Sequence, residues 1–474
     1  EHSLDVRRVS GSSPLTSTKF FIYRAPVVRG LYFYSFGENY MTFNIITFGC
    51  KVNQCESEDI CASMVQKGFS FKENSEDSEI VIINSCTVTA ESDRKLRQTI
   101  HRVKRVNKEC IVVLTGCMPQ AEPDIASKIE GIDIVLGNKD KMLLPNMIEN
   151  YLKNPHKVFK IESIKNVVKF EKSNINHSPN RCRAFLKIQD GCNRFCSYCI
   201  IPYARGRVRS KPLEQIEKDV GMISANGYKE IVLVGINLSS YGTDIGCDLY
   251  DAVNTVAKFS GIERIRLGSL EPDLMTDDLI DKLSSEPKIC PQFHLSLQSG
   301  SDKILKSMRR RYTRQEYLEV VNKLRIKFKN ATFTTDIMVG FPGETESDFE
   351  DTLKIIGEAK FLKVHVFPYS PRPNTPAADM KNQIDKSIKS QRVKKVIEIS
   401  ENCSRIVLEG FLKSYSKVLY ETVDKNGLYE GYTPNYILVK SNSNEDIRGK
   451  IVDTYLSDVK ENFVQGLFKQ SDCE

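Results

Sequence analysis

Three cysteines lie within one eight-residue stretch, at Cys192, Cys196 and Cys199. Thiolates at such spacing are ligands of zinc and of iron–sulfur clusters, which usually take four protein ligands. A set of three therefore leaves one metal position open. On a four-iron cluster, that position can be chelated by a small molecule that carries an amine and a carboxylate. The alternative is a zinc site that recruits Cys182 as its fourth ligand.

A second set of three cysteines, Cys50, Cys86 and Cys117, is widely spaced along the chain. Each follows the end of a short apolar segment. If these segments are parallel strands, their carboxyl ends emerge at one edge of a sheet, so the three thiols can converge there. Cysteines that only fill a core would fall at varied positions along strands. The shared position therefore favours a metal site over three buried core thiols.

The elements that must position the second set indicate a parallel α/β domain, which we place at residues 41–155. Continuous apolar strands that alternate with helical patterns are typical of a parallel sheet covered on both faces. The expected strands are residues 44–48, 80–83, 111–114 and 132–136. Residues 155–180 are polar and rich in Lys, Asn and Ser, which indicates a linker.

A second series of strands and helices follows, at residues 178–408. Six βα units of this length predict a partial (βα)₆ barrel, with its chemistry at the carboxyl ends of the strands. The cysteine run at 192–199 comes directly after the first strand of this series, which is where a site is expected. The expected strands are residues 184–188, 230–234, 264–267, 294–297, 332–339 and 363–367.

The last part of the chain, residues 411–470, changes character. Short strand patterns are joined by polar turns, with no long helical pattern between them. This predicts a small antiparallel β-barrel of the type that holds RNA on a basic and aromatic face. A capping or dimerising module is the alternative.

Composition and charge limit the class of protein. The 474 residues are 40% hydrophobic and 27% charged, and the net charge is +7. No stretch resembles a secretory signal or a membrane span, so we expect a cytoplasmic protein whose fourteen cysteines are metal ligands or free thiols. Basic clusters at 94–108, 205–211 and 309–311 fit nucleic-acid contact or a solvated helix face equally well. We expect residues 1–40 to be a disordered extension or an over-called start, with organelle targeting as an alternative.

The Cys-x₃-Cys-x₂-Cys run on a partial barrel, with Tyr198 before its last ligand, resembles the radical S-adenosylmethionine (SAM) superfamily. Residues 41–470 further resemble the methylthiotransferases of that superfamily, and the C-terminal barrel resembles their TRAM-type RNA-binding module. The motifs that carry this resemblance are Gly49-Cys-Lys-Val-Asn53, Asn84-Ser-Cys-Thr-Val-Thr89, Thr115-Gly-Cys117, Ala204-Arg-Gly206 and Gly340-Phe-Pro-Gly-Glu-Thr345.

This resemblance implies an enzyme with two 4Fe–4S clusters and SAM as cofactors. The run at 192–199 would hold the cluster that binds SAM, and the three N-terminal cysteines an auxiliary cluster that presents sulfur. One SAM would methylate the sulfur, and another would yield a 5′-deoxyadenosyl radical that abstracts hydrogen from an unactivated C–H bond. No catalytic side chain beyond the cluster ligands is expected, and His294 and His365 are interpreted as core residues of strands.

Further site residues follow from the resemblance. Four of them, Gly235, Glu271, Gly340 and Glu344, stand where the superfamily contacts SAM, although a glycine after a strand is also an ordinary turn residue. Lys51-Val52 and the motif at 365–370 resemble the branch that inserts a methylthio group at C2 of N6-threonylcarbamoyladenosine beside the anticodon of tRNA. The alternatives are N6-isopentenyladenosine in tRNA and an aspartate of a ribosomal protein.

A threonylcarbamoyl group carries a carboxylate, so its pocket needs cations or hydrogen-bond donors. Arg205, Arg207 and Arg372 are the candidates for substrate binding, with phosphate binding as an equal alternative. The expected partners are tRNA and an electron donor such as flavodoxin or ferredoxin, and we expect a monomer. A different class stays open, namely an RNA-binding protein that carries iron–sulfur clusters only as structural supports.

Overall fold

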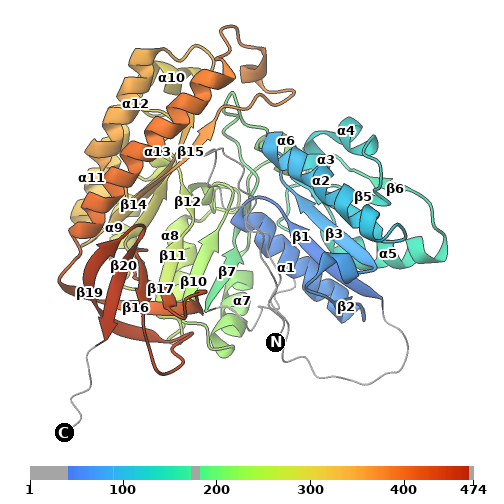
Figure 1. Ribbon diagram of the computed structural model, residues 1–474, viewed down its shortest axis with the longest axis horizontal. Coiled ribbons are helices and arrows are strands. Elements are labelled where there is room, and N and C mark those ends of the chain that lie inside the picture. The colour runs from blue at the N-terminus through green and yellow to red at the C-terminus, as the bar shows by residue number, and fades with distance from the viewer. Residues whose placement is uncertain (1–40, 89, 172–181, 469–474) are drawn as a thin grey trace.

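The chain folds into three domains in contact with one another, as the ribbon in Figure 1 shows. The computed structural model describes residues 41–88, 90–171 and 182–468. The extension predicted for residues 1–40 lies outside the described residues. Within them, no helix is long and apolar enough to cross a membrane.

The N-terminal domain is a six-stranded sheet in which every neighbouring pair is parallel, in the order β2-β1-β3-β4-β5-β6. Its strands are β1 (Thr42–Thr47), β2 (Ser70–Phe71), β3 (Ile80–Ser85), β4 (Ile111–Gly116), β5 (Ile134–Leu136) and β6 (Val158–Lys160). Its helices are α1 (Lys51–Gln66), α2 (Ala90–Val106), α3 (Cys117–Ala121), α4 (Pro123–Ser127) and α5 (Leu144–Lys153).

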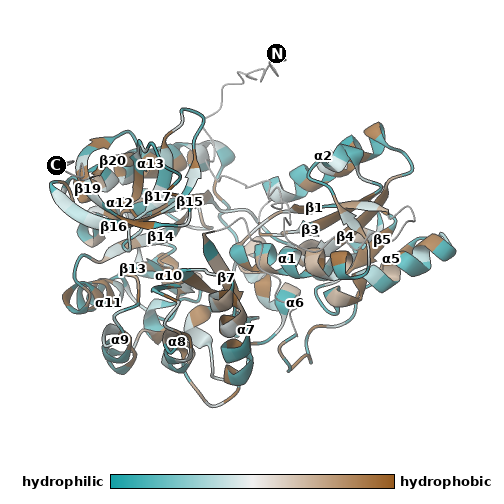
Figure 2. Ribbon diagram, turned by 90° about the horizontal axis from the view of Figure 1, so that it is seen from below, coloured by the Kyte–Doolittle hydropathy of each residue, from teal (hydrophilic) through white to brown (hydrophobic). Residues whose placement is uncertain are grey.

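The apolar strand residues of this sheet are buried on both faces. Helix α2 packs Leu96 and Ile100 against one face, and α1 and α5 pack residues such as Ile60 and Ile148 against the other. Figure 2 shows the hydrophobic strands between these helices. The parallel α/β prediction is confirmed. Strand β6 falls inside the stretch 155–180 that was predicted as a linker, so the sheet continues past residue 155.

The central domain is a curved parallel sheet in two hydrogen-bonded parts, β11-β10-β7 and β12-β13-β14-β15. Strands β7 and β15 are its two ends, which confirms the partial barrel. The strands are β7 (Arg183–Lys187), β10 (Glu230–Val234), β11 (Arg264–Leu267), β12 (Ser269–Leu270), β13 (Gln292–Leu295), β14 (Thr332–Val339) and β15 (Lys363–Pro368). A small antiparallel pair, β8 (Gln189–Asp190) and β9 (Arg209–Ser210), stands beside them.

Helices cover the outer face of this curved sheet. Alternate strand residues such as Leu186 and Leu233 pack outward against α7 and α8 in the largest core cluster. The residues between them point to the inner face and are mostly polar. The helices are α6 (Ile201–Arg205), α7 (Leu213–Ala225), α8 (Leu249–Ala257), α9 (Asp277–Ser284), α10 (Asp302–Ser307), α11 (Arg314–Lys327), α12 (Glu346–Ala359) and α13 (Lys386–Glu409).

The C-terminal domain is a closed five-stranded barrel in the order β16-β17-β18-β20-β19. One pair, β18 with β20, is parallel and the others are antiparallel. The strands are β16 (Ser414–Val423), β17 (Tyr429–Tyr432), β18 (Leu438–Ser441), β19 (Ile451–Lys460) and β20 (Phe463–Phe468). The small barrel predicted for residues 411–470 is thereby confirmed.

Buried ion pairs join the C-terminal barrel to the amino ends of β7, β10 and β11. Glu230 is fully buried, and its carboxylate accepts from Arg266 Nε at 2.8 Å. The same guanidinium donates to the Pro434 carbonyl at 2.9 Å, and Arg183 pairs with Glu421 at 2.5 Å. The barrel is therefore docked through charges that are removed from water.

Candidate active site

The first cysteine set lies in the loop that follows β7 and β8, at the carboxyl end of the first barrel strand. Cys196 is buried, and Cys192 and Cys199 are partly exposed. Phe195 lies between them with a φ of +49°, a conformation that a phenylalanine rarely adopts. The Cys192 amide donates to the Gly206 carbonyl at 3.0 Å. The loop is thus a tight turn held at its base.

Polar donors point at the sulfurs of this set. Arg310 Nη1 lies 3.4 Å from Cys196 Sγ, and Asn237 Nδ2 lies 4.0 Å from Cys192 Sγ. Arg310 Nη2 also donates to Glu271 at 2.5 Å. The amide oxygen of Asn237 is buried and has no hydrogen-bond partner among the described residues. Donors around sulfur stabilise cluster thiolates, so these surroundings fit an iron–sulfur cluster.

The second set stands at the carboxyl ends of β1, β3 and β4. A Cβ added at Gly49 would lie 2.8 Å from Cys86 Cβ, so the turn before Cys50 touches the turn at Cys86. Burial and the neighbouring thiols of Cys117 and Cys50 together raise the pKa of the Cys86 thiol to about 12. Because β1, β3 and β4 are adjacent and parallel, the turns that carry the three cysteines lie at one edge of the sheet. Their role as ligands of one cluster stays a prediction.

Asparagine side chains also lie beside the sulfurs of this second set. Asn138 Nδ2 lies 3.7 Å from Cys117 Sγ and donates to the Ala204 carbonyl at 2.7 Å, while Cys50 Sγ lies 3.6 Å from Asn53 Oδ1. Asn138 Oδ1 is buried without a partner among the described residues. Ala204 belongs to α6, which directly follows the first cysteine set. Asn138 therefore links α6, which follows the first set, to Cys117 of the second set.

The spacing of the thiols bears on the zinc alternative. Among the described residues, no three Cys, His, Asp or Glu side chains lie close enough to hold one ion. A four-iron cluster is larger and holds its cysteines farther apart. Cys182, the fourth ligand of the zinc alternative, lies at the amino end of β7 with its Sγ 3.8 Å from the Glu421 carbonyl. It stands at the wrong end of the strand to join Cys192.

The residues predicted to contact SAM stand at the carboxyl ends of β10, β12 and β14, the same rim as the first cysteine set. A Cβ at Gly235 would lie 2.8 Å from Gln189 Oε1, which accepts from the Asn237 amide, so a side chain there would displace that bond. Glu344 is buried, accepts from the Gly340 amide at 2.6 Å and pairs with Arg392 at 2.6 Å. Its other oxygen has no partner among the described residues. A role in SAM binding stays a prediction for these residues.

The three predicted substrate arginines have different surroundings. Arg205 is buried, and its guanidinium bonds Glu56 at 2.7 Å, Asn53 at 2.7 Å and Asp190 at 3.1 Å. Arg372 is also buried and pairs with Asp93 at 2.7 Å. These two join the N-terminal domain to the core. Arg207 is exposed and lies over the Phe195 ring at 5.4 Å. Substrate contact stays a prediction, and Arg207 has the freest guanidinium of the three.

Sequence reasoning missed the polar inner face of the partial barrel. His294 and His365 were interpreted as core residues, but His365 is exposed and His294 is partly exposed on that face. Asp336 stands between them, with its Oδ2 3.3 Å from His294 Nε2. The helix-facing residues of these strands are apolar, so strict alternation in segments such as Gln292–Leu295 and Lys363–Phe367 was the signal for a polar lumen.

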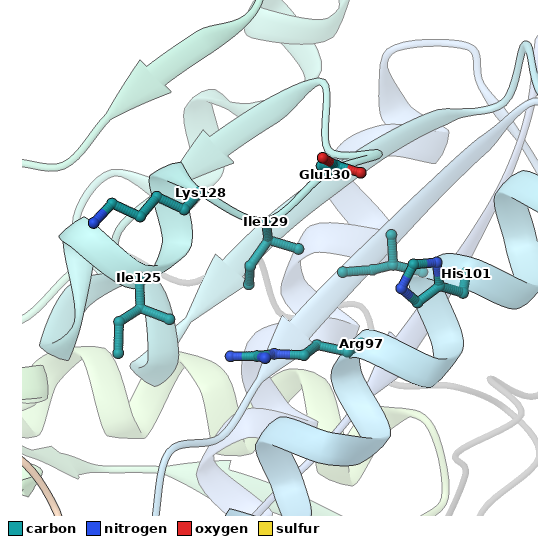
Figure 3. Close-up of a pocket in the computed structure, with 7 residues that line it drawn as sticks. Arg97, His101, Ile125, Lys128, Ile129 and Glu130 are labelled. Atoms are coloured by element: carbon teal, nitrogen blue, oxygen red, sulfur yellow. The ribbon is translucent and has the colours of Figure 1, made fainter.

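A separate pocket of about 370 Å³ lies between α2 and the segment after α4, away from both cysteine sets. Figure 3 shows Arg97 and His101 on one side and Lys128 on the other. The full lining is Arg97, Ile100, His101, Ile125, Lys128, Ile129 and Glu130. Three basic side chains against one acid make it suitable for an anion, and α2 carries one of the basic clusters noted in the sequence.

Comparison with known proteins adds independent information. Residues 186–356 match the Radical SAM superfamily, and residues 42–137 match the Uncharacterized protein family UPF0004. The chain is similar in fold to the radical SAM methyltransferase TsrM from Kitasatospora setae, with a TM-score of 0.54 at 13% identity, over 72% of this chain and 77% of that one. At this sequence identity, the similarity to TsrM concerns the fold alone.

Curated relatives align over most of the chain. Threonylcarbamoyladenosine tRNA methylthiotransferase MtaB of Bacillus subtilis is 36% identical over 86% of this chain and 91% of its own length. The protein of the same name in Aquifex aeolicus is 39% identical over 86% of this chain and 98% of its own. A tRNA-2-methylthio-N(6)-dimethylallyladenosine synthase of Alkaliphilus oremlandii is 34% identical over 91% of this chain and 93% of its own.

Proposed function

The chain belongs to the methylthiotransferase family of radical SAM enzymes, and on that premise we propose that it methylthiolates C2 of N6-threonylcarbamoyladenosine beside the anticodon of tRNA. One observation carries the reaction class. Two sets of three cysteines stand at the carboxyl ends of strands, and α6 follows one set in sequence and contacts Asn138 beside the other. An open metal position in each set is what a cofactor and a transferable sulfur require.

As a radical SAM protein, the chain uses one 4Fe–4S cluster together with SAM. We assign Cys192, Cys196 and Cys199 to that cluster. The second cluster, on the three N-terminal cysteines, is part of the proposal. When bound, these groups supply one-electron reduction, a radical that removes the C2 hydrogen, and the sulfur and methyl that replace it.

The protein's own residues hold and orient these groups. Arg310 and Asn237 donate toward the sulfurs of the SAM cluster, and Asn138 donates toward Cys117. Arg205 fixes the spacing between the two sets, because it extends from α6 and bonds Asn53 and Glu56 of α1. Those contacts are buried, so the distance between the two clusters is set by a rigid interface and not by a hinge.

The remaining partners are proposed from chemistry and from the relatives. A tRNA would lie across the C-terminal barrel, whose strands expose aromatic residues such as Tyr415, 56% exposed. The reductive step requires an electron donor such as flavodoxin or ferredoxin, and the protein is proposed to act in the cytoplasm as a monomer.

The competing substrate is the dimethylallyl (isopentenyl) adenosine named in other relatives. That group is wholly apolar, whereas the inner face of the barrel carries His294, Asp336 and His365. Burying such polar groups against a hydrocarbon removes their contact with water and costs free energy, even where they bond one another. The polar lumen therefore favours the threonylcarbamoyl substrate.

A direct assay separates the two substrates. Purified, anaerobically reconstituted enzyme is given SAM, reductant and one of two anticodon stem-loops, which differ only in a threonylcarbamoyl or an isopentenyl group on the adenosine. We expect methylthio product from the first RNA and at least about 10⁴-fold less from the second. Comparable product from both would contradict the substrate assignment. An absence of 5′-deoxyadenosine with every substrate would instead support a structural role for the clusters.

A further inference from the structure

Lys51 stands at the junction of the N-terminal domain and the barrel lumen. It is the first residue of α1 and directly follows Cys50. Its ammonium lies 6.0 Å from the centre of the Phe185 ring, which belongs to the inner face of β7. Val52, the next residue, packs against Val232 and Val234 on the inner face of β10. The start of α1 is thus inserted at the open side of the partial barrel.

The ammonium of Lys51 makes no ion pair within the part of the chain that the structure describes, and its side chain is exposed. Neighbouring cations have acidic partners. Lys187 pairs with Asp190 at 2.6 Å, and Arg183 pairs with Glu421 at 2.5 Å. Lys363 also faces the lumen, but it begins β15 and so stands at the end opposite the cysteine loop.

The charge of Lys51 faces the inner side of β7, because its ammonium lies over the Phe185 ring. A cation is stabilised when an anion binds beside it, and none of the described acidic side chains pairs with this ammonium. The lumen therefore has a place for one negative group beside the start of α1.

The substrate supplies such a group at the right distance from the reaction. In adenine, C2 and C6 both flank N1, so a substituent on N6 lies close to the carbon that receives sulfur. The threonylcarbamoyl substituent ends in a carboxylate. A side chain that starts one residue from a ligand of the sulfur-presenting cluster can reach it while C2 faces that cluster.

We propose that Lys51 binds the carboxylate of the threonylcarbamoyl group and is a specificity residue for this substrate. The inference rests on the proposed function and deepens it. Arg205 and Arg372 have acidic partners inside the protein, whereas the ammonium of Lys51 has none among the described residues. An apolar dimethylallyl group would leave this ammonium without an anion, so the same residue that attracts one substrate disfavours the other.

The test compares two stem-loops that carry threonylcarbamoyladenosine with a free carboxylate or with the same carboxylate converted to its methylamide. Affinity and kcat/KM are measured with reconstituted wild-type enzyme, Lys51→Gln, Lys51→Arg and the control Lys67→Gln. Lys67 caps the other end of α1 at the surface, where it pairs with Glu149. Iron content is measured for every variant because Lys51 adjoins Cys50.

We expect Lys51→Gln to weaken binding of the carboxylate RNA by about 10- to 100-fold, the range of a charge-assisted hydrogen bond, and to change binding of the methylamide RNA by less than about twofold. Lys51→Arg should keep most of the affinity, and Lys67→Gln should match wild type. Equal losses on both RNAs, or no loss on either, would overturn the proposal. If wild type gives no product on the carboxylate RNA, the proposed function itself fails. The wild-type measurement thus separates that outcome from a failure of the Lys51 proposal alone.

Discussion

Arg310 contacts the groups around the SAM cluster through three of its nitrogens. It donates to Cys196 Sγ, to Glu271 and, through Nε, to the Tyr312 hydroxyl at 2.9 Å. A cation that donates to a cluster thiolate favours the reduced, more negative state. We therefore expect Arg310 to act as a positioning residue whose charge raises the reduction potential of the proposed SAM cluster.

Replacing Arg310 by Gln should lower the midpoint potential of the SAM cluster on the order of 50 mV, because one charge and one hydrogen bond to sulfur are lost. The potential is measured by redox titration with EPR detection, in a chain whose Cys50, Cys86 and Cys117 are Ala. The exposed neighbour Arg311→Gln is the control. An unchanged potential at full iron content would exclude this role.

At the residue scale, the sequence indicates the two cysteine sets as candidate ligands but does not indicate the side chains that surround them. The run at 192–199 is local, so its chemistry can be read directly from the sequence. Two partners of Arg205 lie far away in sequence, since Asn53 is 152 and Glu56 is 149 positions earlier. Nothing in the motif around Arg205 indicates that its guanidinium is hydrogen-bonded to side chains of the N-terminal domain. The sequence indicated Lys51 only because the pair Lys51-Val52 resembles one branch of the family, and it did not indicate that this cation has no acidic partner among the described residues.

At the element scale, the second cysteine set depends on three separate strands. β1, β3 and β4 are adjacent and parallel, so the turns that follow them meet. No single segment contains these three cysteines, so the proposed cluster site can form only once the sheet has formed.

Replacing Cys50, Cys86 and Cys117 together by Ala should remove about half of the bound iron and leave SAM cleavage to 5′-deoxyadenosine intact. Replacing Cys192, Cys196 and Cys199 should also remove about half of the iron and abolish that cleavage, because the open iron that binds SAM is lost. Iron and sulfide assays with product chromatography check both results.

The matched control is a triple Ala variant of Cys61, Cys110 and Cys403, which are buried thiols in hydrophobic clusters. It should keep full iron content, although it removes packing atoms. Full iron content in either of the other two triple variants would show that those cysteines are not ligands.

Elements with long apolar runs could be predicted, and elements made by tertiary pairing could not. Strands β3 and β4 are fully buried and read clearly as strands. β2, with two residues, and β6, with three, have no periodicity of their own and form because a neighbouring strand pairs with them. β17 likewise has no clear strand pattern of its own, since its short segment Tyr429–Tyr432 contains a glycine and is ordered by pairing with β16 and β18.

At the scale of the whole molecule, Glu230 connects the central domain to the C-terminal barrel. Its carboxylate is buried, yet Arg266, Arg183 and Arg264 outweigh that burial and lower its pKa to about 2. An acid with an ordinary pKa of 4.5 in the unfolded chain thus stabilises the folded chain above pH 4.5. The contribution is lost as the pH falls from 4.5 toward 2, and its full size is about 3 kcal/mol.

Glu230→Gln should therefore be less stable than wild type at pH 7, and the difference should shrink as the pH falls below 4.5. Urea unfolding of both cluster-free chains at pH 7, 5, 4 and 3 gives the comparison without interference from acid loss of iron. Glu263→Gln, an exposed pair partner of Lys229, is the control. A difference that stays constant from pH 7 to 3 would contradict the assigned role.

The ion pairs under the C-terminal barrel also bear on the synthesis of the chain. Arg183, Glu230 and Arg266 are made long before Glu421 and the carbonyls of Thr433 and Pro434 that complete their network. Until those last residues leave the ribosome, the guanidiniums of Arg183 and Arg266 share the single carboxylate of Glu230 and stay exposed to water. A truncated chain therefore carries excess positive charge on this surface, which the finished chain buries under its C-terminal barrel.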